Sequence, residues 1–132
     1  MAKRSRKSCF KHFGATPINV QWSRSARTAD NKAVVVSLWQ DKLVMAMPHA
    51  ITYTHAPSDR WFKSPGQLEL RDNLIWSRDK CGGIFSVVVV IAKDRTALRR
   101  SVANSEPEDR YKMRLTSLDA TNGAFTAEAV WR

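Results

Sequence analysis

The sequence predicts an α+β fold: a strongly curved sheet, mixed or antiparallel, or an open barrel, with one main helix packed against it. Three observations predict it. Residues 87–91 are a run of β-branched side chains without a charge, which is typical of a strand covered on both faces. Residues 64–82 carry the start and stop signals of one long helix. Shorter segments with alternating apolar residues bring the expected total to about six strands.

The chain length sets the expected domain organisation. A chain of 132 residues with 43% hydrophobic residues is long enough to bury a core as one domain. We expect a single globular domain over residues 12–132, preceded by a flexible basic arm over residues 1–11. No apolar run is long enough to span a membrane or to form the core of a signal peptide. We therefore expect a cytoplasmic protein with no membrane partner.

The predicted central strand covers residues 82–93, and the predicted helix leads directly into it. Ser64 is a suitable N-cap, Pro65 fits the first helical position, and Gly82 is a suitable stop. Leu70 and Leu74 lie on one stripe of this helix. The helix should therefore pack across the sheet.

The remaining elements are shorter. Alternation over residues 18–39 and 111–131 predicts two hairpins, and Asn122-Gly123 is a strong turn signal in the second. Residues 43–47 and 51–55 are predicted strands, and residues 56–63 a loop. Residues 94–107 are polar and predict at most one short helical turn.

Charge is the strongest functional signal. The chain has 22 Lys and Arg against 12 Asp and Glu, a net charge of +10. Residues 1–29 hold seven of these basic residues and no acidic one, so the excess is concentrated at one end. Such an arm is typical either of a polyanion partner, most often nucleic acid, or of a solubilising tail.

The motifs of common catalytic sites are missing from the sequence. The three histidines lack the spacing of a zinc site, and there is no Cys-x-x-Cys, phosphate-binding loop or nucleophile elbow. Glu69 and Asp72, three apart on the helix, are interpreted as partners of nearby arginines. We expect no metal and no cofactor, and catalysis is the less favoured interpretation.

Five tryptophans in 132 residues are the second signal. Trp61 falls in a polar loop and Trp76 lies off the apolar stripe of the helix, whereas Trp22 and Trp39 fall in predicted strands and are equally consistent with core positions. Stacking of a base on an aromatic ring contributes about 1–3 kcal/mol, enough to select an unpaired base when two rings sandwich it.

Several blocks resemble a family of small, mostly uncharacterised bacterial proteins. They are residues 13–16 (Phe-Gly-Ala-Thr), 19–26, 34–41, 64–66, 83–94 and 113–119. The second block usually reads Trp-Ser-Trp in that family, whereas here Arg24 stands at the second aromatic position. If that position lines an aromatic pocket in relatives, the pocket is altered in this chain.

A second resemblance is architectural. The small curved sheet, single helix and aromatic residues resemble PUA-like domains, the group with the EVE, ASCH and YTH types, which read RNA or modified bases. No diagnostic motif accompanies this analogy of fold.

These observations favour a nucleic-acid-binding module that grips phosphates with its basic arm and reads an unpaired or modified base with an aromatic and arginine face. DNA and RNA are both open as partners. The residues predicted to make the contact are Lys3, Arg4, Arg6, Lys7, Lys11, Trp22, Arg24, Arg27, Trp39 and Trp61.

Two alternatives and one assembly are also predicted. A protein-interaction or antagonist module, related to phages or defence, would use its exposed tryptophans as hot spots against a nucleic-acid-handling protein. A small metal-dependent nuclease would use Asp94 or His55. The hairpin over residues 111–131 would leave an open sheet edge through which a homodimer could form.

Overall fold

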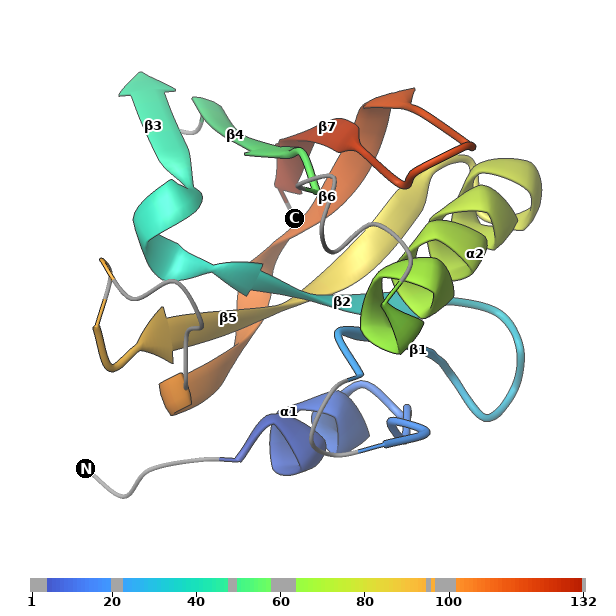
Figure 1. The fold of residues 1–132 in the computed structure, drawn as a ribbon, viewed down its shortest axis with the longest axis horizontal. Coiled ribbons are helices and arrows are strands. Elements are labelled where there is room, and N and C mark those ends of the chain that lie inside the picture. Colours follow the sequence, from blue (N-terminus) through green and yellow to red (C-terminus); the bar gives the residue numbers. More distant parts are fainter. Residues whose placement is uncertain are drawn as a thin grey trace.

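The computed structural model describes residues 5–19, 23–47, 50–57, 64–94, 96 and 102–131, except for the side chains of residues 46 and 47. These residues form two α-helices, one short 3-10 helix and seven strands (Figure 1). The elements are α1 (Arg6–His12), β1 (Ser25–Arg27), β2 (Val34–Trp39), η1 (Gln40–Lys42), β3 (Val44–Met47), β4 (Ala50–His55), α2 (Pro65–Lys80), β5 (Ile84–Ala92), β6 (Val102–Leu118) and β7 (Phe125–Trp131).

The seven strands form one mixed sheet in the order β1-β2-β5-β6-β7-β4-β3. β2 and β5 are parallel, and every other neighbouring pair is antiparallel. The predicted α+β class and mixed sheet are confirmed. The predicted strong curvature and open barrel are wrong, because the sheet is neither closed nor strongly curled. The apolar face that would line a barrel is covered by α2 instead.

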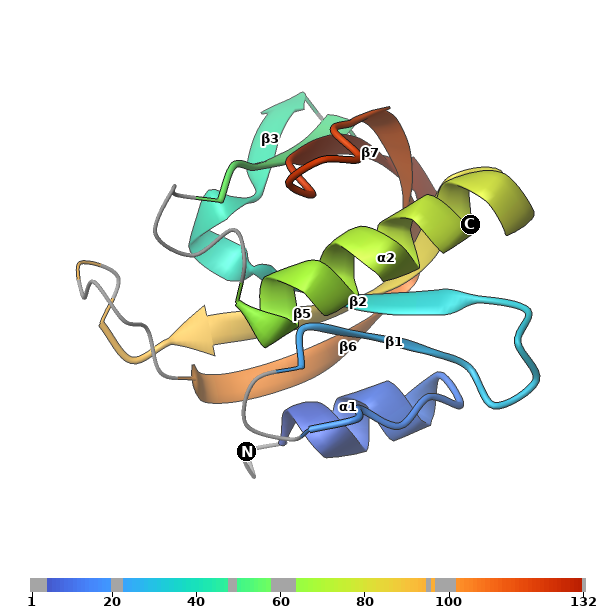
Figure 2. The same cartoon turned by 45° about the vertical axis from the view of Figure 1, so that its right-hand side comes forward.

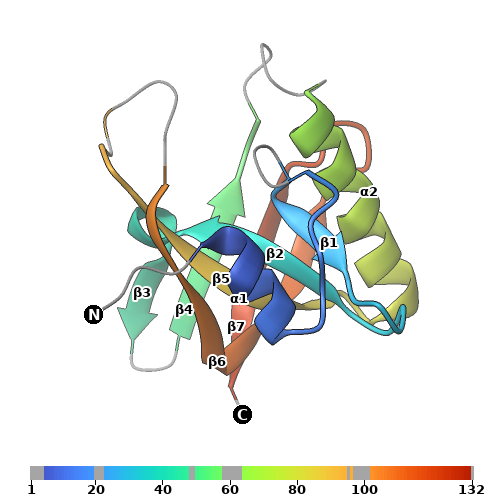
Figure 3. The same cartoon turned by 90° about the horizontal axis from the view of Figure 1, so that it is seen from below.

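The two helices cover opposite faces of the sheet, as Figure 2 shows for the region of β1 and β2. We call these the α2 face and the α1 face. On the α2 face, the core includes Val36 and Val87 together with Leu74 of the helix. On the α1 face, Val35 and Val88 pack with residues of α1, which lies across the sheet in Figure 3.

The predicted central strand is confirmed in its main property. β5 lies inside the sheet, between β2 and β6. Phe85 and Val87 are buried on the α2 face, and Val88 and Val90 are buried on the α1 face. A strand covered on both faces needs apolar residues at consecutive positions, which explains the unbroken valine run.

The start and end of α2 match their sequence signals. The Ser64 hydroxyl accepts a hydrogen bond from the Gln67 N–H, and Pro65 is the first helical residue. After Lys80, Gly82 and Gly83 adopt left-handed backbone angles, with φ of +64° and +79°. These glycines turn the chain into β5.

The basic arm is the first correction. Residues 1–4 lie outside the described part of the chain, but Arg6–His12 form α1 rather than a flexible segment. The Ser5 hydroxyl caps the helix by accepting from the Ser8 N–H, and Cys9 and Phe10 are buried against the sheet. Phe10 thus anchors the helix by apolar packing, although so short a helix is marginal in isolation.

The length of β6 is the second correction. Its polar first half, which we expected to be irregular, pairs with β5 from Val102 to Glu108. Pro107 is tolerated there because β7 pairs with β6 only from Tyr111 onward, so β6 has one neighbour at this point. The helical turn expected here is wrong for Val102, which belongs to β6. Residues 97–101, the rest of that expected turn, lie outside the described ranges.

The predicted second hairpin, β6–β7, is confirmed, but it is not at an edge. β7 pairs with β4 on its other side, and the two strands that end the sheet are β1 and β3. The proposed homodimer edge at residues 111–131 is therefore wrong. Among the described residues, no helix has both the length and the apolar character that crossing a bilayer requires.

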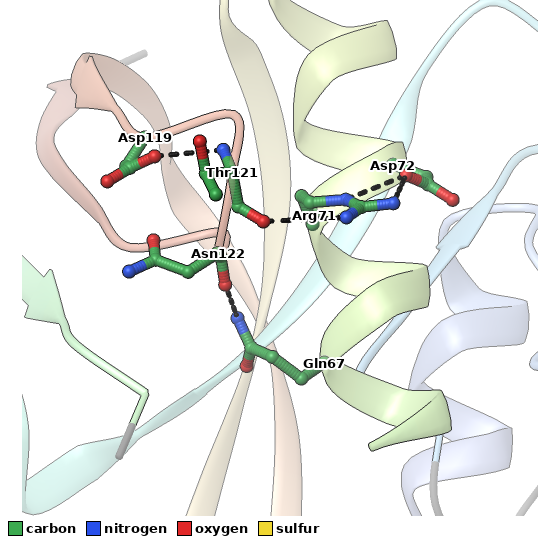
Figure 4. Close-up of polar contacts among 6 residues, drawn as sticks. All are labelled: Gln67, Arg71, Asp72, Asp119, Thr121 and Asn122. Atoms are coloured by element: carbon green, nitrogen blue, oxygen red, sulfur yellow. Dashed lines mark hydrogen bonds and ion pairs between the residues drawn. The ribbon is translucent and has the colours of Figure 1, made fainter. Parts of the chain in front are cut away.

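The turn between β6 and β7 is hydrogen-bonded to α2 (Figure 4). The Gln67 Nε2 group donates to the Asn122 carbonyl at 2.9 Å, and Arg71 Nη1 donates to the Thr121 carbonyl at 3.4 Å. The Asp119 carboxylate accepts from the Thr121 N–H at 2.8 Å and holds the turn itself. Gly123 is buried at this contact with φ of +80°.

This contact predicts a large effect of Gly123→Ala. The added Cβ would lie 2.6 Å from Gln67 Nε2 and 3.0 Å from Arg71 Cβ. A left-handed alanine costs about 1–2 kcal/mol, and overpacking adds about 1–3 kcal/mol. Chemical denaturation should therefore show a loss of about 2–5 kcal/mol in the free energy of unfolding.

Gly82→Ala is the matched control. Gly82 also has a positive φ, +64°, but an added Cβ would meet nothing within 4 Å. Only the backbone penalty applies, about 1–2 kcal/mol. Equal losses in the two variants would contradict the close packing of the turn against α2.

Candidate functional site

Two arginines from separate elements lie close together where the chain enters β1. Arg6 is the first residue of α1, and its Nη1 group donates to the Ser23 carbonyl at 3.3 Å. Arg24 immediately precedes β1, and its carbonyl accepts from the Ser37 N–H of β2. Both side chains are half-buried. Burial lowers the pKa of each guanidinium, and the charge of Arg24 lowers the pKa of Arg6 further.

The Arg24 guanidinium has no acidic partner in the described part of the chain. Within the described ranges, no carboxylate pairs with it and no side chain accepts a hydrogen bond from it. Several other arginines do have an acidic partner: Arg71, Arg78 and Arg110 each bind a neighbouring carboxylate. A partly desolvated cation is unfavourable unless something pairs with it.

A fixed histidine lies near this cation. The backbone carbonyl of Asn122 can only accept, so the Gln67 amide must point its NH₂ group there and its oxygen toward His55. The His55 Nε2 atom lies 2.9 Å from Gln67 Oε1 and must therefore carry the proton. In the neutral ring, this leaves Nδ1 as a hydrogen-bond acceptor.

The surroundings of His55 keep it neutral. Burial is the largest cause that lowers its pKa, and the charges of Arg24 and Lys42 lower it further. The hydrogen bond to Gln67 acts in the opposite direction but is the smaller influence. His55 also borders an open depression of about 590 Å³ at the end of β4, which Ser117, Asp119 and Phe125 help to line.

Glu69 of α2 completes this region. Its Oε1 atom is buried and has no hydrogen-bond partner in the described part of the chain. Burial raises the pKa of its carboxyl group, while the Ser23 hydroxyl lowers it. Ser23 is also the residue whose carbonyl accepts from Arg6, so an acid and two cations meet around one short segment. We call Arg6, Ser23, Arg24, His55 and Glu69 the Arg24 site.

The outer surface of α1 adds two more cations. Lys7 and Lys11 are exposed and four residues apart, which places them on one side of the helix. Neither forms an ion pair with a described residue. The Asp109 carboxylate contacts His12 instead, with Nε2 of His12 and Oδ1 of Asp109 2.8 Å apart.

The residues that the sequence predicted to contact nucleic acid lie in different parts of the structure. Arg6, Lys7 and Lys11 lie on α1, and Arg24 lies beside Arg6. Arg27 is on the α2 face, where it stacks 4.8 Å from the Trp76 ring centre and donates to Asn73 Oδ1. Trp39 is half-buried and packs against the α1-face cluster. Lys3, Arg4, Trp22 and Trp61 lie outside the described residues.

The two residues suggested for a nuclease, Asp94 and His55, are not grouped with other metal-binding side chains among the described residues. The Asp94 carboxylate accepts from the N–H and hydroxyl of Thr96 and so holds a turn. Across the described ranges, no group of three or more His, Cys, Asp or Glu side chains is placed to hold a metal ion.

Sequence reasoning did not identify Gln67, Ser23 or Glu69 as parts of a site. Gln67 carried one signal, its position three residues after the Ser64 cap, but that signal concerns the helix start. Ser23 and Glu69 come together only through packing of the segment before β1 against α2.

Comparisons of the chain with protein-family models, with curated protein sequences and with solved structures find no match. The resemblances noted from the sequence therefore stay predictions.

The His55 environment predicts an acid-sensitive fold. The unfolded chain should protonate His55 near pH 6.5, whereas the folded protein resists protonation to lower pH. Because the unfolded state then binds more protons, the free energy of unfolding should fall as the pH drops below that point. His55→Gln should lose less stability than the wild type between neutral and mildly acidic pH, as measured by urea titrations.

An NMR titration tests the cause directly. The His55 ring should titrate below the usual histidine value. A normal or raised pKa for His55 would contradict the assignment.

Proposed function

We propose that the protein binds nucleic acid, with the Arg24 site and the outer surface of α1 holding the phosphate backbone. The observation that carries the proposal is the half-buried Arg24 guanidinium, which has no anionic partner among the described residues. A phosphate oxygen would supply the missing charge, and guanidinium groups bind phosphate through paired hydrogen bonds.

The arrangement of Arg6 beside Arg24 supports an anion with more than one oxygen. An anion bound by both guanidinium groups would offset the cost of desolvating each of them. It would also reduce the repulsion between Arg6 and Arg24. Lys7 and Lys11 would continue the contact along α1 to neighbouring phosphates. A net charge of +10 attracts such a polymer from a distance.

A single-stranded segment suits the neighbouring groups better than a duplex. The neutral His55 offers one hydrogen-bond acceptor, and the buried Glu69 Oε1 atom, which has no partner among the described residues, offers another. Groups of this kind read the exposed edges of unpaired bases. The depression beside His55 provides space of about 590 Å³, with Phe125 in its lining.

The proposal predicts salt-dependent binding of short single-stranded oligonucleotides of DNA or RNA. Fluorescence anisotropy should show affinity that falls steeply with salt, because bound phosphates release counterions. In the double variant Lys7→Gln/Lys11→Gln, the slope of log affinity against log salt should shrink by about 1.4 for single strands, which is two phosphate contacts.

The matched control is Arg78→Gln/Lys80→Gln. It removes the same charge from the last turn of α2, on the opposite face of the sheet. Its salt slope should stay close to the wild type. Absence of binding by the wild type at low salt, or equal slopes for the two double variants, would overturn the proposal.

Arg24→Met separates binding from folding. Methionine keeps an apolar stem but removes a half-buried charge that no described acid pairs with, so the free energy of unfolding should not fall and is expected to rise. Affinity for the oligonucleotide should fall about tenfold or more, the usual effect of losing a charged hydrogen bond. A variant that is less stable and binds normally would show that Arg24 has a structural role.

A further inference from the structure

A second surface of the molecule differs from the cationic Arg24 site, because it combines an apolar groove with acidic side chains. A groove of about 310 Å³ lies between the η1–β3–β4 segment and the strands β5 and β6. Its apolar lining includes Leu43, Val89 and Tyr111, which pack with the core of the α2 face. Glu106, Glu108 and Arg110 stand at the same groove.

One carboxylate of the groove is available for a ligand. Glu108 already binds Arg110, through contacts of 2.8 Å to Nε and 2.9 Å to Nη2. Glu106 is exposed, and no described residue pairs with it. An unpaired acid beside an apolar lining, in a chain of charge +10, favours a ligand with one positive charge and an apolar body.

Tyr111 adds a polar group to the apolar lining. It lies within an irregularity of β6, where residues 109–112 stand opposite the single residue Ser86 of β5, and such bulges redirect side chains. Burial and the charge of Glu108 raise the pKa of Tyr111 to about 12, so its hydroxyl remains a donor. Within the described chain, no residue forms a hydrogen bond with this hydroxyl.

The neighbouring strand indicates what kind of ligand carries the charge. β3 is an end strand of the sheet, so the backbone groups on its outer side have no strand partner. Val44 and Met45 are 57% and 65% exposed, which is unusual for large apolar residues on an edge. Met45 lines the groove and pairs with Ile51 of the α2-face core.

From these observations, we infer that β3 and the groove bind an extended segment of a partner protein, with an arginine or lysine among apolar residues. The segment adds a strand to the outer edge of β3. Because alternate side chains of a strand share a face, one of its side chains lies beside Met45 at the groove and reaches Glu106.

The test uses a fluorescein-labelled heptapeptide with one central arginine between alternating valine and threonine residues. The wild-type protein should bind it with one-to-one stoichiometry in fluorescence anisotropy. The same peptide with citrulline in place of arginine should bind about tenfold or more weakly, since citrulline keeps the shape and removes the charge. General attraction cannot explain the binding, because the protein is itself strongly cationic.

Variants locate the site. Glu106→Gln should weaken arginine-peptide binding about tenfold and abolish the preference over citrulline, and Met45→Thr should weaken both peptides. Glu128→Gln, which removes an acid that pairs with Arg114 outside the groove, should bind as the wild type does. Circular dichroism confirms that each variant is folded. An oligonucleotide bound at the Arg24 site should not compete with the peptide.

Four outcomes overturn the inference. They are absence of peptide binding by the folded wild type, equal binding by Glu106→Gln, displacement of the peptide by N-acetyl-arginine amide at equal concentration, and dimerisation through β3 in analytical ultracentrifugation. The third would show a site for small cations, and the fourth would show that β3 pairs with a second copy.

Discussion

The buried carboxamide of Gln67 joins three parts of the molecule that are far apart in sequence. It lies in the first turns of α2, donates to the turn between β6 and β7, and accepts from His55 of β4. A buried polar group without a partner costs about 1–3 kcal/mol, so both ends of this amide need their contacts. The close approach at Gly123 makes these contacts possible. The position of α2 on the sheet therefore depends on a polar contact as well as on apolar packing.

The same contact has a chemical consequence. Because Asn122 offers a carbonyl, the amide has one orientation, and His55 has one tautomer. Burial and nearby cations then keep the ring neutral. A histidine that is fixed, neutral and adjacent to the desolvated Arg24 is a specific acceptor beside a specific cation. This arrangement suits an anionic ligand, because no described carboxylate pairs with the Arg24 guanidinium.

Charge is distributed so that the molecule presents two different surfaces. Among the described residues, Lys7, Lys11 and Arg24 have no acidic partner, whereas Arg110 and Arg114 pair with Glu108 and Glu128. The groove beside β3 has an apolar lining and an acid, Glu106, that pairs with none of the described residues. The two proposed ligands, a nucleic acid and a basic peptide segment, would therefore use separate sites of opposite charge.

The elements that the sequence predicted correctly are those with local causes. The β-branched run of β5, the Ser64 cap of α2 and the Asn122-Gly123 turn each follow from side chains within a few residues. The errors concern residues whose state depends on distant partners. α1 is a helix because Phe10 reaches the core of the α1 face. The polar half of β6 is a strand because β5 offers it an edge.

By itself, the sequence determined the central strand, the main helix and the concentration of positive charge in residues 1–29. Only the tertiary structure decided the strand order, the open sheet and which of the predicted contact residues meet. It brought Arg6 to Arg24 and set Arg27 against Trp76 on the other face. The physical reason is that propensity and charge belong to single residues, whereas desolvation and pairing depend on neighbours that only the folded chain provides.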